Sequence, residues 1–268
     1  MKILLPTDFS ENAELATKFA LDLAKKTDGH ILAFHAYDVP QYERSMTTSL
    51  LEEMREAAEK NMRDFESSFL KNSSVSYSSK ILIGNPIRLS KELIEKNNRE
   101  VVIMGTKGAS GMEEFLIGSN AASVIHNVDV PVMVIPPKTK PGDFKSMVLA
   151  SDLEFKNRQE PLQKLAKFAR VYQAKVSILH IQDEDGVPHG TRDMVAGALG
   201  DIPHSYHISG ESDDVEGSIL DFCEKQKADL VVAISKRYGF FQRLFHKSLT
   251  SKLAYHSKIP MLALHEPH

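Results

Sequence analysis

An internal repeat is the feature of this 268-residue sequence that most limits how it can fold. The two halves open alike, because Ile3–Phe9 reads ILLPTDF and Met147–Leu153 reads MVLASDL. Their closing strands also correspond, with VPVMVIPP from Val130 and IPMLALHE from Ile259, at an offset of 129 residues. Self-similarity of this kind predicts two copies of one structural unit.

Within the first copy, apolar runs with strand character alternate with helical stripes. Helices are expected around residues 15–28 and 51–69, after Pro86, and after Ser119, which we expect to be an N-cap. Alternation of this type predicts an open, mostly parallel five-stranded sheet with helices on both faces. The expected strands are Lys2–Leu5, Ile31–Tyr37, Tyr77–Ile83, Val101–Met104 and Val132–Ile135.

The second copy follows the same scheme, with a short helix around 194–199 in place of the long one. A segment rich in Lys, Pro and Gly, residues 136–144, reads as the linker between the copies. We therefore expect two tandem domains, 1–137 and 144–268.

Composition and charge exclude several classes of protein. With 42% hydrophobic and 26% charged residues, the chain has the composition of a soluble globular protein. A net charge of −3 disfavours a general nucleic-acid binder. The opening MKILLPTDFS is too short for a signal peptide or a membrane span, so we expect a cytoplasmic protein without a membrane partner. The single Cys223 excludes an internal disulfide and is expected to be a buried, inert thiol.

A glycine pattern after the fourth strand is the strongest functional signal. Gly105, Gly108 and Gly118 precede Ser119 at the expected start of a helix. Glycines at the carboxyl end of a parallel strand let backbone N–H groups approach phosphate oxygens, and the helix dipole favours the same anion. Neither a P-loop nor a Rossmann dinucleotide fingerprint occurs. The alternative is that these glycines only make turns.

The end of the first strand lies at the same predicted edge of the sheet. Pro6 and Thr7 lead there to Asp8, whose carboxylate suits a ribose hydroxyl or a magnesium ion held by phosphates. The backbone at Ala36 and Met104 is placed to frame a nucleotide base. The alternative for Asp8 is a helix cap.

Several short segments of the first copy together form a recognisable set: ILLPTDFS, FHAYD, the GNP turn at Gly84, MGTKG from Met104, the Gly118–Ser119 pair and PVMVIP. In these residues the sequence resembles the universal stress protein family. The resemblance covers essentially the whole chain as a tandem pair. It implies Rossmann-like domains of the adenine nucleotide alpha hydrolase type, ATP binding with or without magnesium, and pairing of domains through their last strands. It places nucleotide contacts on Pro6, Thr7, Asp8, Ala36, Met104, Gly105, Gly108, Gly118, Ser119 and Asn120.

The second copy departs from the glycine pattern. At the offset of 129, Gly105 becomes Ile234, Gly108 becomes Arg237 and Gly118 becomes Lys247. Side chains at these positions block the close backbone approach that phosphates need, so we expect no nucleotide of this kind in the second copy.

Three functions remain open from the sequence. The first is a regulatory protein that binds one ATP in its N-terminal domain and pairs its two domains internally through the final strands. Further association into a homodimer is compatible with this function. The second is a slow ATPase or an autophosphorylating protein that uses Asp8 with magnesium. The third is a non-catalytic interaction module. His204 and His207 are weak metal candidates, because no further ligand follows in sequence, and we expect neither a metal site nor a nucleophilic triad.

Overall fold

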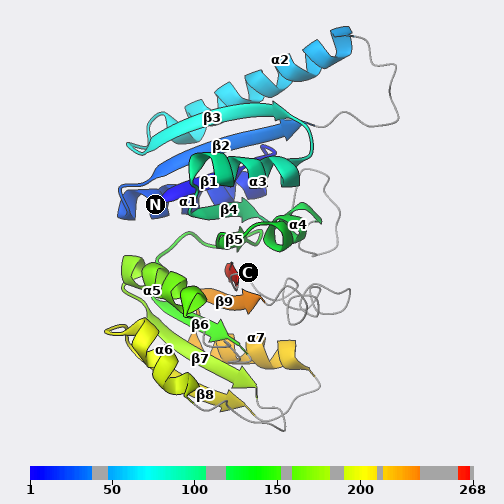
Figure 1. The fold of residues 1–268 in the computed structure, drawn as a ribbon. Helices are drawn as coiled ribbons and strands as arrows, with labels where there is room; N and C mark the ends of the chain where they lie inside the picture. Colours follow the sequence, from blue (N-terminus) through cyan, green and yellow to red (C-terminus); the bar gives the residue numbers. More distant parts are fainter. Residues whose placement is uncertain are drawn as a thin grey trace. The chain divides into compact units, whose positions relative to one another are not determined.

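The computed structural model describes residues 1–37, 48–106, 119–151, 159–181, 190–209, 214–235 and 259–265. These residues divide into two compact units, and the chain passes from one to the other between Pro137 and Lys138 (Figure 1).

The first unit contains a five-stranded sheet in the order β3-β2-β1-β4-β5, in which all neighbouring strands run parallel. Its strands are β1 (Lys2–Pro6), β2 (His30–Tyr37), β3 (Ser76–Ile83), β4 (Val101–Gly105) and β5 (Val132–Ile135). Its helices are α1 (Glu11–Lys26), α2 (Thr48–Phe65), which continues into the π-helix η1 (Glu66–Leu70), α3 (Pro86–Asn97) and α4 (Ser119–Asn127).

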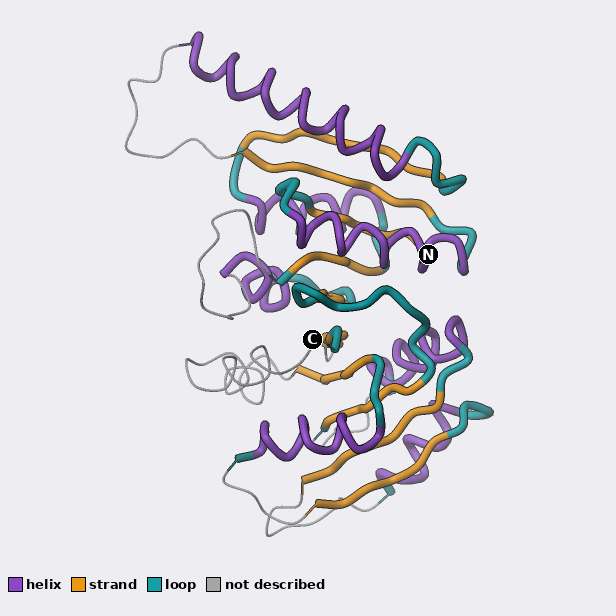
Figure 2. Tube along the Cα trace, turned by 180° about the vertical axis from the view of Figure 1, so that it is seen from behind, coloured by secondary structure: helices purple, strands orange, loops and turns teal. Residues whose placement is uncertain are grey.

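The helices of the first unit cover both faces of its sheet. Helix α1 packs on β1, β4 and β5 and touches η1, whereas α3 packs on β1 and β2 and touches α4. Figures 1 and 2, which view the chain from opposite sides, show these two layers with the strands between them. The central strands are therefore apolar on both sides, and Ile3, Leu4 and Leu5 are fully buried.

The second unit has the same plan with the strand order β10-β9-β6-β7-β8, again parallel throughout. Helix α5 contacts α6, and α7 packs on β6 and β7. Its strands are β6 (Ser146–Ala150), β7 (Lys175–Ile181), β8 (His204–Ser209), β9 (Leu230–Ser235) and β10 (Met261–His265). Its described helices are α5 (Glu160–Tyr172), α6 (Thr191–Leu199) and α7 (Val215–Gln226).

Equivalent hydrogen bonds show that the same strand pairing occurs in both units. The amide of Val102 donates to the carbonyl of Pro131 at 2.9 Å, and the amide of Val231 donates to that of Pro260 at 3.0 Å. Gly105 pairs with Ile135 in the ladder of β4 and β5, and Ile234 pairs with Leu264 in that of β9 and β10. Each pair differs by the same offset of 129 that separates the repeats in the sequence. The predicted fold class is thus confirmed.

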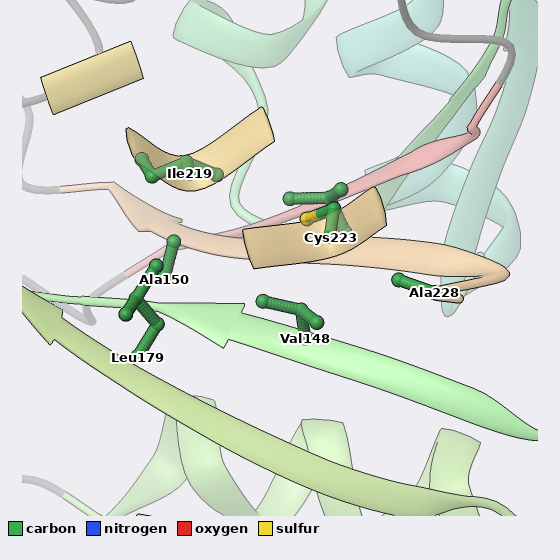
Figure 3. Packing of buried hydrophobic residues seen from close by; sticks show 7 residues of the cluster. Val148, Ala150, Leu179, Ile219, Cys223 and Ala228 are labelled. Atoms are coloured by element: carbon green, nitrogen blue, oxygen red, sulfur yellow. The ribbon is translucent and has the colours of Figure 1, made fainter. Parts of the chain in front are cut away.

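Cys223 lies in a hydrophobic cluster between α7 and the sheet of the second unit. It is fully buried, and Figure 3 shows it near Ile219 and Ala228, with Val148 of β6 across from the helix. The prediction of a buried thiol is confirmed.

Candidate functional site at the carboxyl edge of the first sheet

The candidate site lies where the strand order of the first unit reverses. From β1 the chain adds β2 and then β3 on one side, and then β4 and β5 on the other. Pro6 ends β1 and Gly105 ends β4, so these two residues flank the point of reversal. In open parallel sheets, ligands bind outside the carboxyl ends of the strands at such a point.

A tight turn follows β1 and carries Thr7 and Asp8. The amide of Thr7 donates to the carbonyl of Phe34 on β2 at 2.9 Å, which extends the ladder by one residue. The Thr7 hydroxyl oxygen accepts from the amide of Phe9 at 3.1 Å. Asp8 Oδ1 accepts from the amide of Ser10 at 3.1 Å and from its hydroxyl at 2.6 Å. The side chains of Thr7 and Asp8 therefore stabilise the turn on which they lie.

The alternative in which Asp8 caps the first helix is wrong in detail. Helix α1 begins at Glu11, and its N-cap is Ser10, whose hydroxyl oxygen accepts from the amide of Ala13 at 3.3 Å. Asp8 instead receives the Ser10 hydroxyl hydrogen, so it supports the cap without being the cap.

His35 and Phe9 are two residues of this site that the sequence patterns did not single out. His35 Nδ1 lies 2.8 Å from the carbonyl oxygen of Thr7, and the ring of Phe9 lies 4.5 Å from the His35 ring. Phe9 has a φ of 62°, a left-handed value that is unusual for a bulky residue, and also contacts the ring of Phe65 at 5.9 Å. The FHAYD segment contained His35, but sequence alone does not reveal a hydrogen bond to a residue 28 positions away.

Asn12 explains part of the need for glycine at the end of β4. Its side-chain amide is buried and donates to the carbonyl of Ile135 at 3.0 Å, which also accepts from the amide of Thr106 at 3.1 Å. A Cβ on Gly105 would lie only 2.8 Å from Cγ and Oδ1 of Asn12. The close approach at Gly105 is therefore already required by α1, whether or not a ligand binds.

The ends of β2 and β3 form the neighbouring part of this edge. Ala36 is half-buried near the end of β2 and pairs with Leu82 of β3. Gly84 has a φ of 128°, and its amide donates to the carbonyl of Tyr37 at 2.9 Å. Asn85 then caps α3, because its side chain accepts from the amides of Ile87 and Arg88. The predicted GNP turn is thus a strand-to-helix connection at the same edge.

The glycine loop itself lies only partly within the described residues. Met104 is buried at the end of β4, as expected for a core side chain. Gly108 and Gly118 lie outside the described residues. Ser119 is the first residue of α4, which differs from the expected N-cap position by one residue, and Asn120 is exposed. The structure therefore places Pro6, Thr7, Asp8, Ala36, Met104, Gly105 and the start of α4 at one edge of the sheet.

The corresponding edge of the second unit keeps one contact and loses the glycine. His180 Nδ1 lies 3.3 Å from the carbonyl oxygen of Ser151, as His35 does from that of Thr7. Ile234 occupies the register position of Gly105 and is buried. Arg237, Lys247 and Ser248 lie outside the described residues.

Cys223, His204 and His207 are the other residues that the sequence singled out for a side chain of a reactive or metal-binding type. Burial raises the pKa of the Cys223 thiol to about 12, so its thiolate is scarce at neutral pH. His204 Nδ1 contacts the carbonyl oxygen of Ile202 and His207 Nε2 contacts the Ser205 hydroxyl, both at 2.8 Å. Two strand residues three positions apart face opposite sides of a sheet, so these imidazoles do not converge. Among the described residues no cluster of three His, Cys, Asp or Glu side chains could hold a metal ion. No helix within the ranges given above is long and apolar enough to cross a membrane.

Comparison with known proteins gives one consistent family. The model of the universal stress protein family matches residues 1–136 and 195–265. Universal stress protein MJ0531 from Methanocaldococcus jannaschii is 30% identical over 146 residues, which span 52% of this chain and 84% of that protein. Universal stress protein MJ0577 from the same organism is 26% identical over 159 residues, 51% of this chain and 95% of that protein. The crystal structure of a universal stress protein from Archaeoglobus fulgidus covers 99% of this chain and 96% of its own, with a TM-score of 0.77 and 21% identity, and so shows the same fold.

Proposed function

The chain belongs to the universal stress protein family, and we propose that its first unit binds ATP at the carboxyl edge of its sheet and acts as a nucleotide-dependent regulator in the stress response. One observation carries this proposal: β1 and β4 are neighbouring strands that end side by side at the point where the strand order reverses, and α4 is the helix that follows β4 in the chain. Of the residues that the family resemblance assigns to nucleotide contact, Ala36 lies on β2, and the others lie at the ends of β1 and β4, in the segments that follow these strands, or at the start of α4.

Each proposed contact has a chemical reason. The carboxylate of Asp8 suits a ribose hydroxyl or a magnesium ion carried by the phosphates. The N-terminus of α4 at Ser119 and Asn120, with Gly108 and Gly118 before it, supplies backbone N–H groups and a positive dipole end for the phosphates. The backbone at Ala36 and Met104 supplies the frame for adenine.

The ends of β1 and β4 and the length of α4 support the binding of a nucleotide at this edge. Pro6 ends β1 and Gly105, which has no side chain, ends the neighbouring strand β4, so the two strand ends present little side-chain bulk at this edge. The helix that follows has nine residues, long enough for an effective dipole at its start.

We propose that the second unit binds no ATP in this manner. Ile234 stands at the register position of Gly105 and is buried. Arg237 and Lys247 replace Gly108 and Gly118 in the sequence, so the second unit lacks the glycines that would bring backbone N–H groups close to a phosphate. The expected stoichiometry is therefore one nucleotide per chain.

Calorimetric titration of the full chain with ATP and magnesium tests the proposal. Gly118→Val should abolish binding while the fold is retained, whereas Lys247→Ala, at the equivalent position of the second unit, should leave affinity unchanged. A stoichiometry of two, or binding that survives Gly118→Val, would contradict the assignment. Absence of any binding would favour the non-catalytic interaction module.

The slow ATPase or autophosphorylating alternative differs from a regulator only in the chemical step after binding. Multiple-turnover release of phosphate, or transfer of label from ATP to the protein, separates it from a regulator that only binds. Asp8 is the residue to replace in that test, with Asp8→Asn, because its carboxylate is the one that we place beside magnesium.

The domain limits 1–137 and 144–268, pairing of the two final strands, a homodimer and a cytoplasmic location stay predictions. Light scattering on the purified chain measures the oligomeric state directly.

A further inference from the structure

We propose that His35 is the positioning residue of the candidate site, because it fixes the direction of the peptide group between Thr7 and Asp8. The inference deepens the proposed function and rests on it where nucleotide affinity is concerned. It does not depend on that function for the geometry of the turn.

The hydrogen bond to Thr7 determines the tautomer of His35. A carbonyl oxygen only accepts, so the 2.8 Å contact with Nδ1 requires the proton on Nδ1. The bond joins the middle of β2 to the residue directly after β1 and is not part of the strand ladder. It therefore adds a side-chain restraint at the point where the ladder ends.

The planarity of the peptide bond carries this restraint to Asp8. In a trans peptide the carbonyl of Thr7 and the amide N–H of Asp8 lie in one plane and point in opposite directions. When His35 holds the Thr7 carbonyl, the Asp8 N–H is directed away from His35. The direction of the backbone that leads to the Asp8 carboxylate is fixed by the same contact.

The turn needs such a restraint because its next residue is strained. Phe9 adopts a φ of 62°, which a residue with a bulky side chain seldom occupies. Its ring contact with His35 at 4.5 Å and the bond from its amide to Thr7 Oγ1 at 3.1 Å both hold it there. His35 thus contacts the turn twice, through Nδ1 at Thr7 and through its ring at Phe9.

The second unit provides an internal comparison. His180 makes the same contact, from Nδ1 to the carbonyl of Ser151, at 3.3 Å. This unit has Ile234, Arg237 and Lys247 in place of Gly105, Gly108 and Gly118, so we expect no nucleotide there. The effect of removing the histidine on fold and its effect on ligand binding can therefore be measured in separate halves of one chain.

The experiment compares His35→Leu, His35→Asn and His180→Leu in the full chain. Leu removes the donor at similar volume, whereas Asn keeps an N–H donor on the atom that corresponds to Nδ1. Hydrogen exchange of the Phe9 and Ser10 amides reports on the turn. The amide of Gly84, which donates to Tyr37 at the same edge, reports on loosening of the edge as a whole.

We expect His35→Leu to speed exchange at Phe9 and Ser10 by about two- to tenfold, the factor that corresponds to one net hydrogen bond, with little change at Gly84. Affinity for ATP with magnesium should fall by about two- to tenfold. His35→Asn should recover most of both effects, and His180→Leu should change neither.

The outcomes separate this inference from the proposed function. If the wild-type chain binds no nucleotide but His35→Leu loosens the turn selectively, the proposed function fails and the positioning role stands. If the wild-type chain binds and His35→Leu leaves both the turn and the affinity unchanged, the positioning role is overturned. Equal behaviour of His35→Asn and His35→Leu would also overturn it, because the Nδ1 donor would then be irrelevant.

Discussion

Replacing Gly105 with alanine tests why glycine ends β4. The added Cβ would lie 2.8 Å from Cγ and Oδ1 of Asn12 and 3.1 Å from its backbone carbon. Movement of the Asn12 side chain away from the new methyl group would break a hydrogen bond, because its buried amide donates to the Ile135 carbonyl at 3.0 Å. Overpacking of this kind destabilises a fold by about 1–3 kcal/mol, which we expect for Gly105→Ala.

A double-mutant cycle identifies Asn12 as the cause. Asn12→Ala alone should cost about 1 kcal/mol, the net value of a hydrogen bond, because the Ile135 carbonyl still accepts from Thr106. In the double variant the new methyl group occupies space that the Asn12 side chain has left. The combined loss should therefore be smaller than the sum of the two single losses by about 1 kcal/mol or more.

Hydrogen exchange of the β4 and β5 amides measures these changes in the first unit alone, which matters because a two-unit chain need not unfold in one step. Gly197→Ala is the matched control. Gly197 lies within α6 with no atom within 4 Å of the added Cβ, so alanine should stabilise that helix by about 0.5–1 kcal/mol. Strict additivity of Gly105→Ala and Asn12→Ala, or a neutral Gly105→Ala, would refute the packing argument.

Three further predictions concern other parts of the chain. Cys223, with its pKa raised to about 12 by burial, should react with a thiol reagent at pH 8 only when the protein unfolds; rapid reaction of the native protein would contradict this. Burial, and then the charge of Arg99, lower the pKa of His30 below its value of 6.5 in the unfolded chain. The stabilisation that His30 contributes is therefore fully present above pH 6.5, and it is lost as the pH falls toward the pKa of the folded state. NMR titration should show a higher His30 pKa in Arg99→Met. An unchanged pKa would count against the 2.9 Å contact between the Arg99 guanidinium and His30 Nδ1. Ser10→Ala should cost about 1 kcal/mol through loss of the α1 cap, measured as faster exchange of the Ala13 amide, whereas Ser10→Asp should not.

The sequence by itself determined the architecture, because its information is local and periodic. Strand and helix patterns follow from which residues must be buried, and a repeat at a constant offset shows that the same pattern occurs twice. The offset of 129 between Gly105 and Ile234 is reproduced in the strand register, since the residues opposite them, Ile135 and Leu264, differ by the same number. The edge at which the candidate site lies followed from the direction of parallel strands.

Only the tertiary structure decided which side chains hold that edge together. His35 reaches Thr7 and Asn12 reaches Ile135 across 28 and 123 positions in sequence, and no local pattern encodes such pairs. The assignment of the helix cap to Ser10 depended on the path of the turn after β1, which follows from the left-handed backbone of Phe9. Periodicity tells which residues are buried, but hydrogen bonds between strand ends depend on how the sheet brings distant segments together.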